Sequence, residues 1–327
     1  MKPHLIVQNL KVWFPFTDRS AKRLFGGAKK YVRAVDGVSF TIQRGEIFCL
    51  VGESGCGKST TGNAILRLVP ATEGSVDYNG VDILALQAHQ FSSYRSKLQK
   101  IFQDPYGSLN PRQKILDVVG EPLVIHKRVE NEEDKRERVL NALEAAGLTP
   151  PALFIDKYPH QVSGGQRQRV VIASAIALNP EFIVADEPVS MLDVSIRAGI
   201  IKLLLEMQRE AGLSYLFITH DLSLAWMICN RIAVMYLGQI VEIGLPDTII
   251  HQPSHPYTRA LASVIPVPDA SAGRRKIILE GDIPSPVDIP EGCRFYSRCY
   301  ERIPECQQTA PELRKCAPDH WVACIKA

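Results

Sequence analysis

Apolar residues form two kinds of pattern along the first 250 positions of this chain. Continuous apolar runs of strand length, as at residues 47–51 and 215–219, predict strands buried on both faces. Runs with helical spacing lie between them, and residues 46–51 are expected to start a parallel core. The expected strands are 5–10, 33–42, 46–51, 182–185 and 215–219, and the expected helices are 115–147, 163–178 and 200–208.

The first two strands are expected to form an antiparallel layer, and residues 104–165 a helical subdomain. Beyond residue 230, residues 231–243 alternate about Gly238, which predicts a β-hairpin. Residues 255–261 (HPYTRAL) begin a further helix. A proline-rich linker and five cysteines follow; the prolines are Pro266, Pro268, Pro284, Pro286 and Pro290. We therefore expect a domain of residues 1–250 and a loop-rich extension of residues 251–327.

Composition and charge narrow the class of protein. The sequence is 46% apolar and 22% charged, which is typical of a folded protein with a large core. Its 38 basic and 35 acidic residues give no electrostatic reason to expect nucleic acid as a partner. The most apolar stretch, residues 170–178, is shorter than the roughly 18 residues of a membrane span. Residues 1–10 lack the pattern of a secretory signal, so a cytosolic protein is expected.

The segment GESGCGKST, residues 52–60, fits a phosphate-binding loop. Gly52, Gly55 and Gly57 permit a tight turn in which successive backbone N–H groups converge on phosphate oxygens at a helix N-terminus. Lys58 would reach the β- and γ-phosphates, and Ser59 would hold Mg²⁺. This Walker A pattern alone predicts only a nucleoside triphosphate site, because GTPases, kinases and many ATPases share it.

Other polar residues stand at the ends of expected strands. Asp186 and Glu187 end one strand, where one carboxylate can hold the Mg²⁺ shell and its neighbour can polarise a water molecule. His220 ends another strand, and Gln103 follows a short strand-like run. Taken singly, these residues could be an acidic strand cap and a satisfied histidine, and SGGQ at residues 163–166 could be a turn. Their joint order and spacing favour a shared site.

In the order Walker A, Gln103, SGGQ, Asp186-Glu187, Leu192-Asp193 and His220, the motifs resemble those of the ATP-binding cassette (ABC) ATPases. The resemblance implies an α/β P-loop NTPase fold of ABC type, with a RecA-like core, an antiparallel β layer and a helical subdomain. It implies that Glu187 is the general base, that Gln103 senses the γ-phosphate or the water, and that His220 contacts the γ-phosphate. The implied ligands of Mg²⁺ are Ser59, Gln103 and Asp186. The implied ATP-binding residues are Gly52, Ser54, Gly55, Cys56, Gly57, Lys58, Ser59, Thr60, Gln103 and His220.

The resemblance also implies that one cassette is incomplete. Ser163, Gly164, Gly165 and Gln166, with Asp193, would act on ATP bound to a second cassette, since SGGQ opens a helix whose N-terminus faces that nucleotide. Two cassettes would then enclose two ATP molecules head to tail.

The family stacks an aromatic side chain on adenine. Phe14 is the first choice for this role, with Trp13 and Tyr31 as alternatives on either side of an insert at residues 18–30. Val162 and Met191 depart from the usual Leu and Ala of the family, and both changes keep the side chain apolar.

Cys56 lies inside the loop, beside Lys58 and at a helix N-terminus. The pKa of a thiol is expected to fall there, and alkylation would then block ATP binding. The alternative is that Cys56 is only a small residue that the loop tolerates.

The C-terminal cysteines follow the pattern C-x5-C-x6-C-x9-C-x7-C, from Cys293 through Cys299, Cys306 and Cys316 to Cys324. Disulfides are disfavoured in a reducing cytosol, and the spacing is too wide for an ordinary CxxC zinc site. Four thiolates from a loop-rich segment suit a 4Fe-4S cluster or, as the alternative, a tetrahedral zinc ion. Inert cysteines are the third possibility.

This tail, with HPY at residues 255–257, GESGCGKST, FQDPYGSLNPR and ADEPVS, resembles the ATP-binding subunits of the dipeptide/oligopeptide and nickel importer family. The family pattern selects Cys293, Cys299, Cys306 and Cys324 as ligands and leaves Cys316 out. The resemblance implies an energy-coupling ATPase at the cytoplasmic face of the cell membrane. Its implied partners are a second, paralogous cassette, two membrane permeases and an extracytoplasmic solute-binding protein.

Two other classes of function stay open on the sequence. A soluble cassette ATPase of DNA repair or translation usually carries two cassettes, whereas this chain has one. A non-catalytic nucleotide-sensing or metal-binding module is disfavoured by the intact Glu187 and His220. The cargo, whether peptide, nickel or oligosaccharide, is not encoded here, because specificity in this arrangement belongs to the receptor and the permeases.

Overall fold

The computed structural model describes residues 3–16, 30–265 and 276–327. The insert expected at residues 18–30 lies outside the described residues except for Lys30, and so do Pro266 and Pro268 of the linker. The chain forms two compact units, each assembled from separate stretches of sequence. Unit 1 comprises Met1–Ile42, Ile47–Ala85 and Ile218–Ala327, and unit 2 comprises Gln43–Glu46 and Leu86–Phe217.

Unit 1 contains the expected antiparallel layer. Its strands have the order β2-β1-β4-β5, and they are β1 (Leu5–Phe16), β2 (Lys30–Ile42), β4 (Glu73–Tyr78) and β5 (Val81–Asp82). β1 is longer than predicted, since its pairing with β2 continues to Phe16 and Lys30. Residues 13–16 (WFPF) are an unbroken apolar run that starts at the register shift between Val12 and Trp13, so alternation does not mark this part of the strand.

A second sheet of unit 1 carries the strand that leads into the phosphate loop. β3 (Ile47–Val51) is buried along its whole length and pairs in parallel with β9 (Arg231–Tyr236). β10 (Gln239–Gly244) returns antiparallel to β9, which confirms the hairpin predicted around Gly238. The helices of unit 1 are α1 (Lys58–Ile65), α7 (Leu222–Ile228), α8 (Pro246–His251), α9 (Pro256–Ser263) and α10 (Glu305–Gln308).

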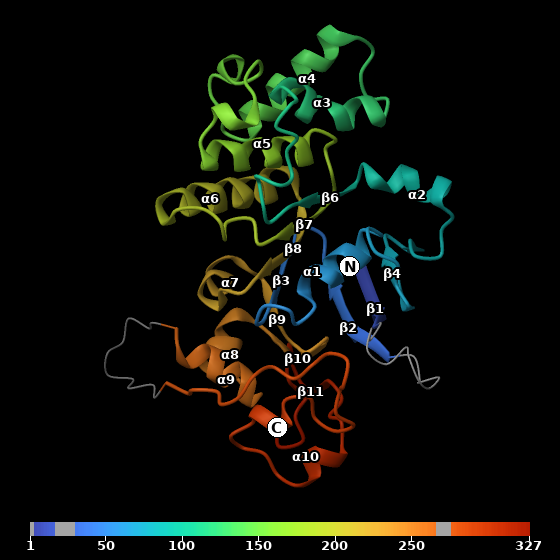
Figure 1. Cartoon of the computed structure of the whole chain (residues 1–327), viewed down its shortest axis with the longest axis vertical. Coiled ribbons are helices and arrows are strands. Elements are labelled where there is room, and N and C mark those ends of the chain that lie inside the picture. Colours follow the sequence, from blue (N-terminus) through green and yellow to red (C-terminus); the bar gives the residue numbers. More distant parts are fainter. Residues whose placement is uncertain (1–2, 17–29, 266–275) are drawn as a thin grey trace, which may run out of the picture. The chain divides into compact units, whose positions relative to one another are not determined.

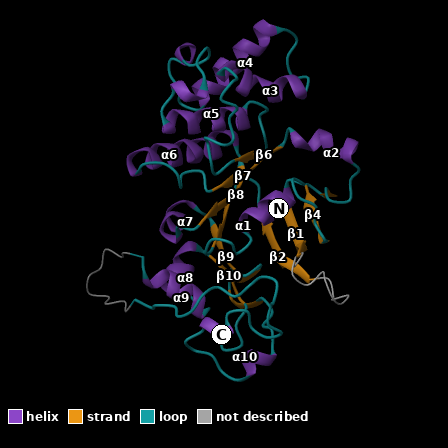
Figure 2. Cartoon of the chain, viewed as in Figure 1, coloured by secondary structure: helices purple, strands orange, loops and turns teal. Residues whose placement is uncertain are grey.

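The extension after residue 275 is mostly loop, as predicted (Figure 2). It adds a hairpin, β11 (Arg314–Ala317) and β12 (His320–Val322), to the edge of β10. The sequence did not indicate this hairpin, because β11 is exposed throughout and therefore shows no alternation.

Cys49 of β3 and Cys229 after α7 are joined by a disulfide with a Cα–Cα distance of 5.9 Å. The sequence did not indicate this pair, which a tertiary contact across 180 residues brings together.

Unit 2 contains a short parallel sheet and the expected helical region. β6 (Leu98–Ile101) pairs in parallel with β7 (Phe182–Asp186), and β8 (Ser214–Thr219) follows in the order β8-β7-β6. The last two residues of β8 belong to unit 1. The helices are α2 (Ala88–Arg95), α3 (Ile115–Ile125), α4 (Glu132–Ala145), α5 (Gly164–Ile176) and α6 (Val194–Ala211).

Helices α3, α4 and α5 pack against one another (Figure 1). The helical stretch predicted at residues 115–147 is two helices, and Asn131 caps the second by accepting a hydrogen bond from the Asp134 backbone N–H at 2.9 Å. α6 begins at Val194, earlier than the predicted residue 200. The sequence pattern missed the first turn because Val194 and Ser195 are exposed and Ile196 is only half-buried. No helix within the described ranges is both long and apolar enough to cross a membrane.

Candidate nucleotide-binding site

The loop between β3 and α1 has the conformation of a phosphate cradle. Gly57 precedes α1 with φ of 108°, a value that L side chains rarely adopt. A Cβ at Gly52 would lie 2.2 Å from the Met235 carbonyl oxygen, so the backbone passes too close there for a side chain. The Lys58 ammonium is buried and donates to the carbonyl oxygens of Gly52 at 2.8 Å and Glu53 at 2.9 Å. Ser59 and Thr60 lie in the first turn of α1, and the N-terminus of a helix favours an anion.

The expected fall in the pKa of Cys56 is wrong, and the structure favours the alternative of a small residue that the loop tolerates. The thiol is only 2% exposed, and this burial raises its pKa above the ordinary value. The neighbouring Lys58 lowers the pKa, but by less than burial raises it. The sequence argument considered only the charge of Lys58 and the helix N-terminus, whereas desolvation is the larger effect. Cys56 is therefore a small buried residue of the loop.

We expect Cys56 to resist alkylation in the folded protein. Iodoacetamide should modify it at least about tenfold more slowly than the exposed Cys316, because only an accessible thiolate reacts. Timed labelling followed by peptide mass spectrometry measures both sites in one sample. Rapid labelling of Cys56 that MgATP prevents would restore the interpretation of a reactive thiolate.

Two of the predicted catalytic side chains meet in unit 2. Gln103 Nε2 donates a hydrogen bond of 3.2 Å to Glu187 Oε2. Asp186 is buried at the end of β7, and its carboxylate lies 2.9 Å from Lys100 Nζ on β6. Sequence reasoning missed Lys100, because nothing in the run LQKI of β6 distinguishes it from a solvent-facing lysine.

Glu187 has an unusual backbone conformation. Its φ is 45°, in the left-handed region that non-glycine residues seldom occupy. Such strain costs on the order of 1–3 kcal/mol and is concentrated at functional sites. This outlier gives an independent reason to consider Glu187 functional.

The segment SGGQ begins a helix, as predicted. Ser163 caps α5 and forms a capping box, in which its hydroxyl accepts from the Gln166 backbone N–H and the Gln166 side chain accepts from the Ser163 N–H. Gly165 is buried against α6, since a Cβ there would lie 2.6 Å from the Ile196 side chain. Ser163 is exposed and so is Asp193, which precedes α6.

The remaining predicted residues belong to unit 1. His220 is exposed and directly follows β8. Trp13, an alternative to Phe14, donates from Nε1 to Asp36 at 3.0 Å, and the Arg33 guanidinium lies 4.9 Å from its ring centre. The Trp13 ring therefore already has two partners within the chain. Phe14 is 37% exposed on the same strand. It stays the first choice for stacking on adenine, and no contact of the described residues tests this role.

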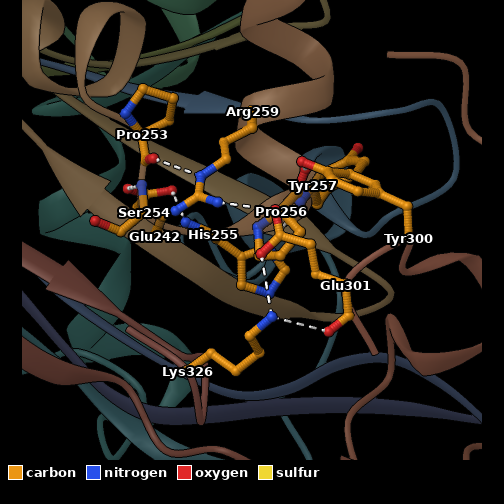
Figure 3. Close-up of polar contacts among 10 residues, drawn as sticks. All are labelled: Glu242, Pro253, Ser254, His255, Pro256, Tyr257, Arg259, Tyr300, Glu301 and Lys326. Atoms are coloured by element: carbon orange, nitrogen blue, oxygen red, sulfur yellow. Dashed lines mark hydrogen bonds and ion pairs between the residues drawn. The ribbon is translucent and has the colours of Figure 1, made fainter. Parts of the chain in front are cut away.

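The HPY segment anchors the extension to β10 (Figure 3). The fully buried Glu242 carboxylate accepts hydrogen bonds from the backbone N–H groups of Ser254 at 2.7 Å and His255 at 3.0 Å. His320 Nε2 of β12 lies 2.7 Å from the same carboxylate. Burial lowers the pKa of His255 to about 4, so its ring is neutral near pH 7 and its Nδ1 accepts from the Tyr257 N–H. Glu301 also forms ion pairs with Arg259 of α9 and with Lys326 near the C-terminus, so these segments are linked as well (Figure 3).

The structure brings the four selected cysteines to one small cavity of about 20 Å³, which Cys293, Cys299, Cys306 and Cys324 line together with Phe295 and Tyr296. Cys316 does not line it and is exposed. Burial first, and then the three neighbouring thiols, raise the pKa of the Cys293 thiol to about 11. Within the described parts of the chain, however, no three His, Cys, Asp or Glu side chains are arranged to hold a metal ion. The grouping of the four cysteines is therefore observed, while the iron-sulfur cluster stays a prediction.

Comparisons with known proteins agree with these motifs. A family described as "ABC transporter" matches residues 35–190, and one described as "Oligopeptide/dipeptide transporter, C-terminal region" matches residues 241–306. The oligopeptide transport ATP-binding protein OppF of Salmonella typhimurium is 46% identical over 324 residues, covering 98% of this chain and 96% of that protein. The oligopeptide transport ATP-binding protein AppF of Bacillus subtilis is 45% identical over 323 residues, with coverages of 98% and 96%.

A solved structure is also similar. The "dimeric structure of a post-hydrolysis state of the ATP-binding cassette MJ0796 bound to ADP and Pi" has a TM-score of 0.63 and 31% identity, covering 74% of this chain and 98% of that one. Fold and motifs thus define a P-loop ATPase cassette of ABC type with a C-terminal extension. The chain belongs to the family of ATP-binding subunits of the oligopeptide/dipeptide ABC transporters.

Proposed function

We propose that this chain hydrolyses ATP to drive a membrane importer of di- or oligopeptides. The observation that carries the proposal is the match of residues 241–306 to the C-terminal region of the oligopeptide/dipeptide transporters. The intact phosphate loop and the hydrogen-bonded pair Gln103–Glu187 support hydrolysis rather than nucleotide sensing alone. We further propose that residues 1–250 act as the ATPase domain, with a helical subdomain at about 104–165, and that residues 251–327 form the extension.

The role of each group follows from its chemistry. The loop N–H groups and Lys58 hold the phosphates, with His220 at the γ-phosphate and Phe14 at adenine. Ser59, Gln103 and Asp186 offer the oxygen ligands that Mg²⁺ prefers, and the ion would offset phosphate charge there.

Glu187 accepts the proton of the attacking water. The hydrogen bond from Gln103 keeps the Glu187 carboxylate oriented for this step.

Two cassettes are proposed to act together, the second being a paralogous subunit. Ser163, Gly164, Gly165, Gln166 and Asp193 would contact ATP on that partner, and the dimeric state named for the MJ0796 cassette supports this arrangement. Two permeases and an extracytoplasmic solute-binding protein would complete the transporter. The chain would then work at the cytoplasmic face of the membrane.

Transport in cells tests the function. Deleting the gene for this chain should abolish uptake of a radiolabelled tetrapeptide, and the wild-type gene should restore uptake. A gene carrying Lys58→Ala should not restore it, because the phosphates lose their positive partner. Nickel uptake, measured in the same cells, is the control. Normal peptide uptake with lost nickel uptake would instead identify a metal importer.

We also propose that Cys293, Cys299, Cys306 and Cys324 hold a 4Fe-4S cluster. Their convergence on one cavity supports this ligand set, and four thiolates are the usual ligands of such a cluster. The tail after Gly292 contributes few buried aliphatic side chains, so a bound cluster would add order that its core does not supply. Zinc bound by the same thiolates is the alternative.

Anaerobically purified protein is expected to be brown, with broad absorption at roughly 400 nm. Replacing any one of the four cysteines by Ser should remove the colour and the iron and should make the tail sensitive to protease. Cys316→Ser is the matched control and should keep both. Stoichiometric zinc in a colourless preparation would favour the alternative, and a preparation without metal would exclude both.

A further inference from the structure

Glu53, the second residue of the phosphate loop, is held through three of its groups. Its backbone N–H donates to the Tyr257 hydroxyl at 3.0 Å. Its carbonyl oxygen accepts from Lys58 Nζ at 2.9 Å. Its carboxylate accepts two hydrogen bonds from Arg298, at 2.7 and 3.2 Å. Two of these three contacts come from the C-terminal extension.

Arg298 is itself fixed in place. It ends a short 3-10 helix, Tyr296–Arg298, between Cys293 and Cys299, and its side chain is only 8% exposed. The two parallel hydrogen bonds to Glu53 form the fork geometry that a guanidinium makes and an ammonium does not. The guanidinium also lies 5.9 Å from the centre of the Tyr236 ring.

An aromatic cluster supports the same stretch. Phe295 is buried, with its ring centre 5.2 Å from that of Tyr236 and 5.4 Å from that of Tyr257. Tyr257 and Arg298 both contact Glu53, and both lie beside the packed rings of Phe295 and Tyr236. The orientation of Arg298 is set by packing rather than by the ion pair alone.

Arg294 makes a second contact between the extension and the region of the loop. It donates to the Leu237 carbonyl oxygen at 2.6 Å and pairs with Asp36. Gly238, the residue after Leu237, donates its N–H to the Cys56 carbonyl oxygen at 2.9 Å. Residues 293–299 thus support the loop at Glu53 directly and at Cys56 through the β9–β10 turn.

These contacts have an electrostatic consequence. Glu53 lies next to Gly52 in the loop that would receive the triphosphate, and its carboxylate repels an anion there unless a cation offsets it. The Arg298 guanidinium supplies that cation from a partly buried position, where solvent screens the pair less than at the surface.

We propose that Arg298 is a positioning residue for ATP binding, which neutralises and orients Glu53 and so couples the cysteine-containing extension to the phosphate loop. The proposal rests on the proposed function only in taking ATP as the nucleotide. It requires neither a peptide cargo nor a metal in the extension.

Nucleotide affinity of the full chain tests the proposal, with a fluorescent ATP analogue and Mg²⁺ as the probe. Arg298→Ala should raise the Kd about tenfold, because a charge-assisted pair is lost and a carboxylate is left unpaired beside the phosphates. Arg298→Lys keeps the charge without the fork and should give an intermediate Kd. Arg302→Ala, on the same segment but exposed, is the matched control and should leave the Kd unchanged.

The double variant Arg298→Ala/Glu53→Gln separates positioning from general support of the fold. Removing the carboxylate should recover most of the lost affinity, whereas a purely structural defect would stay or deepen. Thermal unfolding shows whether each variant folds. If Arg298→Ala does not fold, the Kd values of Glu53→Gln and Tyr257→Phe are compared with that of the wild type instead. Wild-type Kd in Arg298→Ala, or no recovery in the double variant, would overturn the proposal. If the wild type binds no ATP, the proposed function fails instead.

Discussion

Glu187→Gln is expected to lower ATP turnover by the assembled transporter by about 10²- to 10⁴-fold, the usual contribution of a general base. The amide cannot accept the proton of water, but its oxygen can still accept the hydrogen bond from Gln103. ATP affinity should be retained, since Lys58 and the loop are unchanged, and the complex should accumulate with two ATP molecules enclosed. Phosphate release and retained nucleotide are the two measurements.

Glu181→Gln is the control for this experiment. Glu181 immediately precedes β7 and forms ion pairs with Arg44 and Lys97, so its loss removes a carboxylate near the same strand without touching the pair Gln103–Glu187. Turnover of this variant should remain close to that of the wild type. An undiminished rate in Glu187→Gln itself would show that another group takes the proton.

Gly57→Ala is expected to weaken ATP binding by about 100-fold, since adopting a strained backbone costs on the order of 1–3 kcal/mol and the cost falls on the loop itself. A Cβ at this position would lie 2.1 Å from the Ala34 carbonyl oxygen and 2.8 Å from the Met235 methyl group. The φ of 108° is unfavourable for alanine as well. Titration with a fluorescent ATP analogue measures the Kd, and the midpoint of thermal unfolding reports any wider damage.

Gly45→Ala isolates the effect of the close contact. Gly45 also has positive φ, at 70°, but nothing lies within 4 Å of a Cβ built there. This variant should lose about 1–2 kcal/mol of stability from its backbone alone and keep its affinity for ATP. If Gly57→Ala binds ATP as tightly as Gly45→Ala does, the contact with Ala34 does not shape the loop.

Local sequence was sufficient for the elements that carry the main motifs. β3, the glycine loop and α1 follow one another directly, so a buried apolar run, three glycines and a lysine predict both the strand-loop-helix and its anion site. Ser163 and Gln166 likewise form their capping box within a single turn. The predicted ends of β1 and α6 were wrong because bulges and exposed turns interrupt the apolar period there.

By itself, then, the sequence determined the class of fold, the phosphate loop, the signature helix and the order of the candidate residues, because each depends on neighbours within a few positions. The resemblance had already selected the four cysteines that line one cavity. Only the tertiary structure decided the direction in which the pKa of Cys56 shifts, since burial raises it by more than the nearby Lys58 lowers it. It also decided the hydrogen bond between Gln103 and Glu187 and the link from Arg298 to Glu53 across 245 residues. Such contacts depend on how distant segments pack, and no local pattern of residues records that packing.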